Sequence, residues 1–283
     1  MPFLIFSQKI ISVLQCEVNI CILNYMTKTF KHSGTLGDII YSLAVVKNFG
    51  GGEFYLHLNQ VDWITKHYYG GEPNPFHRGR MTQQDFEFME DFMLAQDYIE
   101  KFNVLDPAKD EITHNLDRFR PLFVGHPANY TDTYCMAFNI TDKAVQTEIS
   151  NGPWLTVPTP RPIEGKPYVV NRTARGFTPP GCNPTWTQWR EEGVDKESVF
   201  IGLPDEYTAF KELTGWDIEY YPTKTLLDVA EVIAGCEQFL GNQSVALSIA
   251  QGLRVPYAYE TRVDLPMDRN ESFFPNHENG NYF

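Results

Sequence analysis

The chain has 283 residues, of which 42% are hydrophobic and 21% charged, an ordinary globular composition with room for one large or two medium-sized domains. Its formal net charge of −13 disfavours nucleic acid as a partner, because phosphate binding needs clustered Lys and Arg. The five cysteines are odd in number and lack paired metal-ligand spacing, so we expect reduced thiols, no metal site and a cytoplasmic location.

The first 25 residues are apolar but interrupted by polar side chains, and no run is long enough to cross a bilayer. They also lack the charged start and small-residue cleavage site of a signal peptide. Met26 offers an alternative start just before the first predicted strand. We therefore interpret residues 1–25 as a dispensable extension, with an added edge strand as the alternative.

A strand, a glycine turn and a helix are predicted over residues 27–47. Asp38 lies where a helix carries an N-cap or first-turn acid, ahead of an apolar periodic run. Such a turn places backbone N–H groups and a carboxylate at the edge where α/β sheets bind ligands. The glycine turn consists of His32, Ser33, Gly34, Thr35 and Gly37. The spacing differs from the dinucleotide pattern G-x-G-x-x-G, so no nicotinamide or flavin cofactor is expected.

Less regular elements follow in the first half of the chain. In order, we predict a strand over 53–58, a loop over 59–80, a helix from Thr82 to about Phe102, a mixed region over 106–123 and a helix over 127–138. His114, Arg120 and His126 could face a cleft, although surface or packing roles are the simpler interpretation.

Five prolines between residues 153 and 167 keep the chain extended and mark a domain boundary. Beyond them we predict strands over 168–171, 198–202, 217–221, 238–240 and 255–259, alternating with helices over 185–192, 205–213, 225–234 and 244–251, the last stopped by Gly252. This alternation is typical of a parallel, doubly wound sheet. The expected parts are thus an extension (1–25), a first domain (26–155), a Pro-rich linker (156–167), a second domain (168–262) and a tail (263–283). The tail would either pack across the first domain or fray.

Two stretches in the second half of the chain have the features of an anion-binding site. A predicted strand ends at Gly241, and the turn of Asn242, Gln243 and Ser244 leads into a helix whose N–H groups and dipole favour a diphosphate; simple helix capping is the equal alternative. Arg172 and Arg175 leave the end of the first strand after the linker, where they could clamp phosphate oxygens.

The turn around Asp38 reads Ser-Gly-x-x-Gly-Asp-Ile-Ile-x-Ser-Leu, and the later stretch reads Cys-Glu-x-Phe-Leu-Gly-Asn-Gln-Ser, followed by Ala-x-Gly-x-x-Val-Pro. Together these motifs resemble the heptosyltransferase-type GT-B glycosyltransferases, and most closely the short heptosyltransferase-like proteins of phages and bacteria. The resemblance implies two Rossmann-like, doubly wound domains facing a cleft. It also implies inverting, metal-independent transfer, without a cofactor, from a nucleotide-diphosphate sugar to a hydroxyl acceptor. A phage-encoded protein would act in the host cytoplasm.

The same resemblance assigns roles to individual residues. Asp38 matches the general base, although helix capping would also explain it. The residues around it contact the acceptor or only form the glycine turn: His32, Ser33, Gly34, Thr35 and Gly37. The donor site takes in Arg172 or Arg175 as the phosphate contact, Glu206 after Gly202 as a ribose-binding acid, and the diphosphate turn of Gly241, Asn242, Gln243 and Ser244. The chain departs from the family pattern at Ala44, where proline is usual, and at Gln243, where aspartate is usual. Two alternatives therefore stay open, a catalytically degenerate nucleotide- or sugar-binding protein and a phage enzyme that glycosylates DNA bases.

Overall fold

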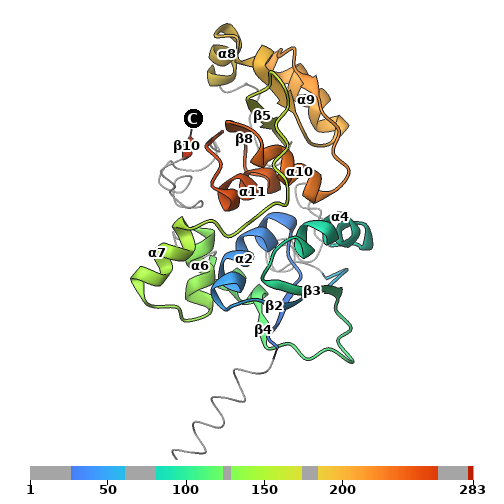
Figure 1. Ribbon diagram of the computed structural model, residues 1–283, viewed down its shortest axis with the longest axis vertical. Helices are drawn as coiled ribbons and strands as arrows, with labels where there is room; N and C mark the ends of the chain where they lie inside the picture. Colours follow the sequence, from blue (N-terminus) through green and yellow to red (C-terminus); the bar gives the residue numbers. More distant parts are fainter. Residues whose placement is uncertain (1–26, 61–80, 124–128, 174–183, 261–279, 283) are drawn as a thin grey trace, which may run out of the picture.

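The computed structural model describes residues 27–60, 81–123, 129–173, 184–260 and 280–282. It contains two β-sheets, one in each half of the chain, and every strand pair in both sheets is parallel. Figure 1 shows the first half (β1 to α7) below the second half (β5 to β10). The predicted α/β class with parallel sheets is confirmed.

The first sheet has four strands, in the spatial order β3 (Ile99–Val104), β2 (Gly52–Leu56), β1 (Thr29–His32) and β4 (His114–Asn115). The helices of this half are α2 (Leu36–Asn48), α4 (Gln83–Leu94), the 3₁₀ turn η1 (Leu116–Phe119), α5 (Arg120–Phe123), α6 (Tyr130–Ala137) and α7 (Lys143–Asn151). The predicted strand–turn–helix unit is confirmed as β1 and α2. Helix α7 was not predicted, and the loop over 59–80 lies almost wholly outside the described residues.

The helix predicted to run from Thr82 to about Phe102 was wrong in its second part. Thr82 does begin α4, with Asp85 in a capping box, but the helix ends at Leu94 and residues 99–104 form β3 beside β2. The cause is a misleading period, because Ile99 and Phe102 are buried three residues apart, as they would be on one face of a helix. The side chain of Phe102 still packs on the apolar face of α4, where its ring stacks on Phe86 at 4.7 Å.

The second sheet has six strands, in the spatial order β10 (Gly280–Tyr282), β9 (Tyr257–Tyr259), β8 (Gln238–Gly241), β5 (Tyr168–Asn171), β6 (Ser198–Phe200) and β7 (Glu219–Tyr220). Its helices are α8 (Pro184–Glu191), the 3₁₀ turn η2 (Val194–Glu197), α9 (Pro204–Thr214), α10 (Leu226–Ala234) and α11 (Val245–Leu253). The predicted alternation of strands and helices is confirmed. The end of the tail, however, forms β10 against β9 rather than packing across the first domain or fraying.

The expected helix stop at Gly252 was also wrong. Gly252 lies inside α11, and the helix ends at Leu253, after which Arg254 takes a left-handed φ of 64°. Gly252 is required for another reason. The extended chain of the linker region crosses here, and the N–H groups of Trp154 and Leu155 both donate to its carbonyl at 3.1 Å. A Cβ atom at Gly252 would lie 2.5 Å from Cδ1 of Leu155.

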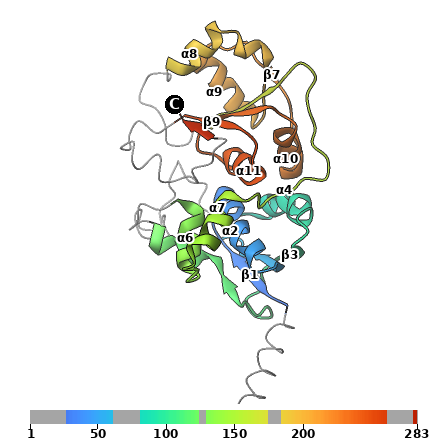
Figure 2. The same cartoon turned by 60° about the vertical axis from the view of Figure 1, so that its left-hand side comes forward.

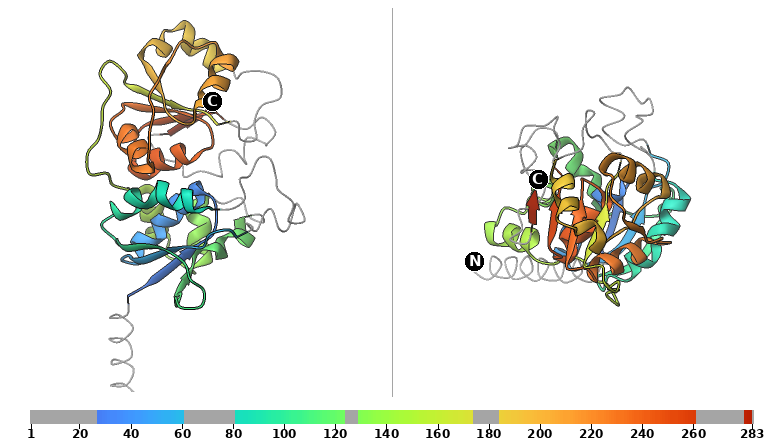
Figure 3. Two further views of the ribbon diagram at one scale, coloured as in Figure 1. Left: turned by 90° about the vertical axis from the view of Figure 1, so that its right-hand side faces the viewer. Right: turned by 90° about the horizontal axis from the view of Figure 1, so that it is seen from above.

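The two halves pack against each other through helices. Helix α2 lies on α11 and α4 on α10, and one continuous hydrophobic cluster includes buried residues from both sheets. Figures 2 and 3 show this packing and the extended segment after α7 that climbs one side of the molecule to β5. The buried Trp154 of that segment donates from Nε1 to the carbonyl of Ile40 in α2, at 3.1 Å. In the described parts of the chain, no helix is both long and apolar enough to cross a membrane.

Candidate functional site

The turn after β1 holds Asp38 at the start of α2. Thr35 is the N-cap, and Asp38 is the third residue of the helix. Its Oδ2 accepts hydrogen bonds from the backbone N–H of Thr35 at 3.1 Å and from the Thr35 hydroxyl at 2.7 Å. The carboxylate therefore caps the helix, yet the residue is also buried, with 4% of its surface exposed. Capping alone would suit an exposed position, so the burial of Asp38 needs a further cause.

That cause is Arg120, the first residue of α5. Its Nη2 forms an ion pair with Oδ2 of Asp38, and the two side chains are only 7% and 5% exposed. Gly34 lets the guanidinium approach. A Cβ atom placed on Gly34 would lie 2.7 Å from Nη2 of Arg120 and 2.6 Å from Cε1 of His32. Glycine is needed here for space, since Gly34 is not among the residues with positive φ.

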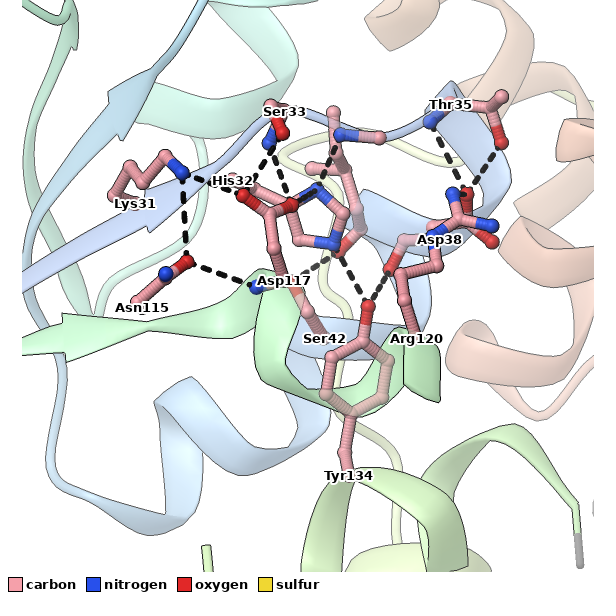
Figure 4. A network of polar contacts seen from close by, with 12 residues as sticks. Lys31, His32, Ser33, Thr35, Asp38, Ser42, Asn115, Asp117, Arg120 and Tyr134 are labelled. Carbon is pink, nitrogen blue, oxygen red and sulfur yellow. Dashed lines mark hydrogen bonds and ion pairs between the residues drawn. The ribbon is translucent and has the colours of Figure 1, made fainter. Parts of the chain in front are cut away.

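A second set of contacts supports the backbone of Asp38 from below (Figure 4). Nδ1 of His32 accepts from the N–H of Gly34 at 2.8 Å, so the proton of a neutral imidazole lies on Nε2. Nε2 lies 2.8 Å from the hydroxyl of Tyr134, which in turn donates to the Asp38 carbonyl at 2.9 Å. Burial lowers the pKa of His32 to about 4, against the opposing effect of Asp117 and Asp38, so the ring is neutral at neutral pH.

Asp117 of η1 ties the loop before α2 to the sheet. Its Oδ1 accepts from the N–H of Ser33 at 2.9 Å, and its Oδ2 accepts from the Ser33 hydroxyl at 2.8 Å and from Nζ of Lys31 at 2.7 Å. Burial opposes ionisation of Asp117, yet its charged neighbours and the Ser33 N–H lower its pKa to about 2. Ser33 is therefore held by a carboxylate.

In the second half, two side chains of the predicted anion-binding turn, Asn242 and Ser244, already make hydrogen bonds within the fold. Asn242 is buried, and its side chain exchanges two hydrogen bonds with the backbone of Thr173, accepting at 3.0 Å and donating at 2.9 Å. These bonds continue the pairing of β5 and β8 beyond their last residues. Ser244 is the N-cap of α11, where its hydroxyl accepts from the N–H of Leu247 at 3.4 Å. Gln243, between them, is partly exposed.

Arg172 has a carboxylate partner that the sequence did not indicate. Its Nε donates to Oε2 of Glu260 at 2.5 Å and its Nη2 to Oε1 at 3.3 Å, and both residues are buried. Glu260 follows β9, and its own N–H donates to the carbonyl of Gly241. Arg172 thus braces the ends of β5, β8 and β9. Arg175 lies outside the described residues, as does His126.

The candidate ribose acid also has a local role. Oε2 of Glu206 accepts from the N–H of Leu203 at 3.0 Å and so caps α9. Gly202 has a φ of 134°, and a Cβ atom there would lie 2.6 Å from Nδ2 of Asn171. The structure therefore brings Gly202 and Glu206 together at the end of β6. They are separated from the turn of Asn242, which follows β8, by strand β5, which lies between β6 and β8.

The two sequence motifs meet where α2 crosses α11. A Cβ atom placed on Gly37 would lie 3.9 Å from Oγ of Ser248, so the first turn of α2 touches the first turn of α11. One turn further on, the hydroxyl of Tyr41 donates to Oε1 of Gln251, which links the two helices through buried side chains. Asp38, in the first turn of α2, and Ser244, the N-cap of α11, thus belong to two helices that are in direct contact.

Four residues of the candidate site were not predicted from the sequence as site residues: Asp117, Arg120, Tyr134 and Glu260. Arg120 was noticed only as one of several residues that could face a cleft. Tyr134 lies 96 residues from Asp38, and no motif links the two. Among the described residues, no three side chains of His, Cys, Asp or Glu are grouped so as to hold a metal ion.

Comparison with known proteins yields structural matches alone. No family model matches the chain, and no curated protein matches it either. The crystal structure of glycosyl transferase family 9 from Veillonella parvula DSM 2008 aligns with a TM-score of 0.58 at 12% identity, covering 92% of this chain and 86% of that one. The structure of E. coli ADP-heptose lps heptosyltransferase II aligns with a TM-score of 0.50 at 12% identity, covering 91% and 90%. The chain therefore has an α/β fold with parallel sheets like that of a family 9 glycosyl transferase and a heptosyltransferase, the kind of protein that its two motifs resemble.

Proposed function

We propose that this protein is an inverting GT-B glycosyltransferase, which moves a sugar from a nucleotide-diphosphate sugar to a hydroxyl group of an acceptor. The observation that carries the proposal is the contact between α2 and α11, where Gly37 lies beside Ser248. It brings the acid of the first motif close to the helix start of the second, in a chain with the fold of family 9 glycosyltransferases. The two halves would be two Rossmann-like domains, residues 26–155 and 168–262, that share a cleft and are joined by the linker over 156–167.

The second half would bind the donor. Backbone N–H groups at the start of α11 point to one place and carry the positive end of the helix dipole, which suits a diphosphate without a metal ion. Gln243 and the Ser244 hydroxyl would add hydrogen bonds. Arg172 would act by holding the ends of the strands, with Arg175 as the residue that contacts phosphate. The structurally similar E. coli protein is an ADP-heptose heptosyltransferase, and we propose a nucleotide-diphosphate sugar of that class as the donor.

The proposed reaction is a single displacement. The carboxylate of Asp38 accepts the proton of the acceptor hydroxyl while the hydroxyl oxygen forms a bond to the anomeric carbon. The bond from that carbon to the diphosphate oxygen breaks, and the electron pair leaves with the diphosphate, where N–H groups stabilise the charge. Attack opposite the leaving group inverts the anomeric centre. A carboxylate is a weak base, which suits a late proton transfer.

The experiment uses a panel of nucleotide-diphosphate sugars that includes ADP-heptose, with release of the nucleoside diphosphate as the readout. Water can serve as a slow acceptor. We expect Asp38→Asn to lower the release rate by about 10²- to 10⁴-fold, the usual contribution of a general base. The thermal shift produced by the donor should remain. Unchanged turnover would remove Asp38 from this role.

A matched control exists in α4. Asp85 is also the third residue of a helix and also accepts from the N–H and hydroxyl of its N-cap, Thr82, at 2.8 and 2.7 Å. Asp85→Asn therefore removes the same capping contacts away from the proposed site, and its release rate should equal that of the native protein. A protein that binds a nucleotide sugar but releases no diphosphate in any mixture would instead be the degenerate binding protein that Ala44 and Gln243 suggest.

A further inference from the structure

The carboxylate of Asp38, proposed as the base, contacts the guanidinium of Arg120, which packs on the ring of Phe119. The guanidinium carbon of Arg120 lies 4.8 Å from the ring centroid of Phe119, its neighbour in the chain. A planar guanidinium fixed on a ring presents its N–H edge in one direction. Nη2 of Arg120 meets the same Oδ2 of Asp38 that accepts both hydrogen bonds from Thr35. The position of the carboxylate is thus set from two separate elements, the loop before α2 and helix α5.

Among the described residues, the charge of Asp38 acts on His32 of β1, Tyr41 of α2 and Tyr134 of α6, and Arg120 of α5 pairs with it directly. Lys31 of β1 and Asp117 of η1 act on His32. Burial keeps the imidazole neutral, and it raises the pKa of both tyrosine hydroxyls well above the ordinary value. The ammonium of Lys31 is paired with Asp117. At neutral pH, Arg120 supplies a positive charge in direct contact with the Asp38 carboxylate.

We propose that Arg120 is a positioning residue of the glycosyl transfer, which keeps Asp38 ionised and aimed, and that Gly34 serves this contact by leaving room for the guanidinium. This role rests on the proposed function. It assigns a purpose to the first glycine of the motif, since any Cβ atom there would collide with Nη2 of Arg120. It also explains how a carboxylate that is 5% exposed stays charged, because a buried carboxyl without a cation takes up a proton.

The test compares pH–rate profiles for donor hydrolysis, with ADP-heptose as the first probe. An opposite charge at contact distance shifts the titration of a carboxyl by about 1–3 units. We therefore expect Arg120→Met to move the acid limb of the profile upward by about 1–3 units, while the KM of the donor stays unchanged. Arg120→Lys keeps a positive charge but lacks the planar pair of N–H donors of the guanidinium, and it should recover part of the hydrolysis rate that Arg120→Met loses. It is also the variant to use if Arg120→Met does not fold.

Arg118 provides the matched control. It is exposed, two residues before Arg120, and its guanidinium lies 5.8 Å from the ring centroid of Phe138. Arg118→Met removes the same charge from the same segment, and its pH profile should match that of the native protein. An Arg120→Met profile that also matches the native one would overturn the positioning role.

A measurement that does not depend on enzyme activity separates the positioning role of Arg120 from the proposed glycosyl transfer. The side-chain NMR signals of Arg120 in ¹⁵N-labelled protein should shift in Asp38→Asn, whereas those of Arg118 should not. If the signals shift and no nucleotide sugar is consumed, the proposed function has failed, and with it the transfer that Arg120 would assist. If sugar is consumed and the Arg120 signals are the same with and without the Asp38 carboxylate, the positioning role alone is refuted.

Discussion

The ion pair between Arg172 and Glu260 offers a quantitative test of what holds the second sheet together. The two side chains are 8% and 4% exposed, and they share two contacts, Nε to Oε2 at 2.5 Å and Nη2 to Oε1 at 3.3 Å. Removal of one partner from a buried pair costs about 3–5 kcal/mol, whereas replacement of both by apolar side chains is often neutral or stabilising. We expect Glu260→Leu to lower the free energy of unfolding by about 3–5 kcal/mol. The double variant with Arg172→Met should recover most of that loss.

Urea unfolding followed by tryptophan fluorescence measures these differences. The control is Lys109→Met, since Lys109 pairs with Asp106 but the two side chains are 80% and 44% exposed. Exposed pairs contribute little, so the control should unfold at nearly the native urea concentration. A Glu260→Leu protein as stable as the native one, or a double variant no better than the single, would refute the reasoning.

The same variants examine the role of Arg172 in donor binding. As a brace, Arg172 should matter to stability, and Arg172→Met/Glu260→Leu should still be stabilised by ADP in a thermal-shift measurement. As a phosphate contact, it should bind better once it is released from Glu260, so that ADP would raise the melting temperature of Glu260→Leu by more than that of the native protein. The geometry favours the brace, because the guanidinium edge already meets a carboxylate.

Three further outcomes are expected. Gly34→Ala should destabilise the protein and abolish donor hydrolysis, because its Cβ atom would lie 2.6 Å from Cε1 of His32, whereas Gly37→Ala, with its nearest such contact at 3.9 Å, should remain folded in circular dichroism. Tyr41→Phe should lose about 1–3 kcal/mol in urea unfolding, because the buried side-chain carbonyl of Gln251 loses the Tyr41 hydroxyl as a donor; an unchanged midpoint would contradict this. Because the folded-state pKa of His32, about 4, lies below its ordinary value of 6.5, the neutral ring contributes stability that is complete above pH 6.5 and lost as pH falls toward 4. The loss is about 3 kcal/mol, and His32→Gln should flatten the stability profile over that window.

Much of the fold could be predicted from short-range patterns. The turn from β1 into α2, the capping boxes that begin α4 and α10, and the alternating strands and helices of the second half each depend on a few neighbouring residues. Prediction failed where one pattern serves two structures. Residues 99–104 bury every third side chain in a strand, as a helix would, and Gly252 was interpreted as a helix stop when it serves a crossing of two segments. The strand at 280–282 carries no local signal for its partner, since β9 alone defines its place.

The candidate site divides in the same way. Local motifs identified Asp38 and Ser244, because a helix start shows itself within four residues of sequence. Local motifs could not identify the charged partners of the site residues, because these partners are distant in sequence. Arg120 lies 82 residues from Asp38, and Glu260 lies 88 residues from Arg172. The sequence by itself thus determined which helices begin with polar groups suited to an anion or a proton. Only the packing of α2 on α11, and of α5 beneath the glycine turn, decided which charges face one another, because burial and contact are properties of the assembled core rather than of any segment.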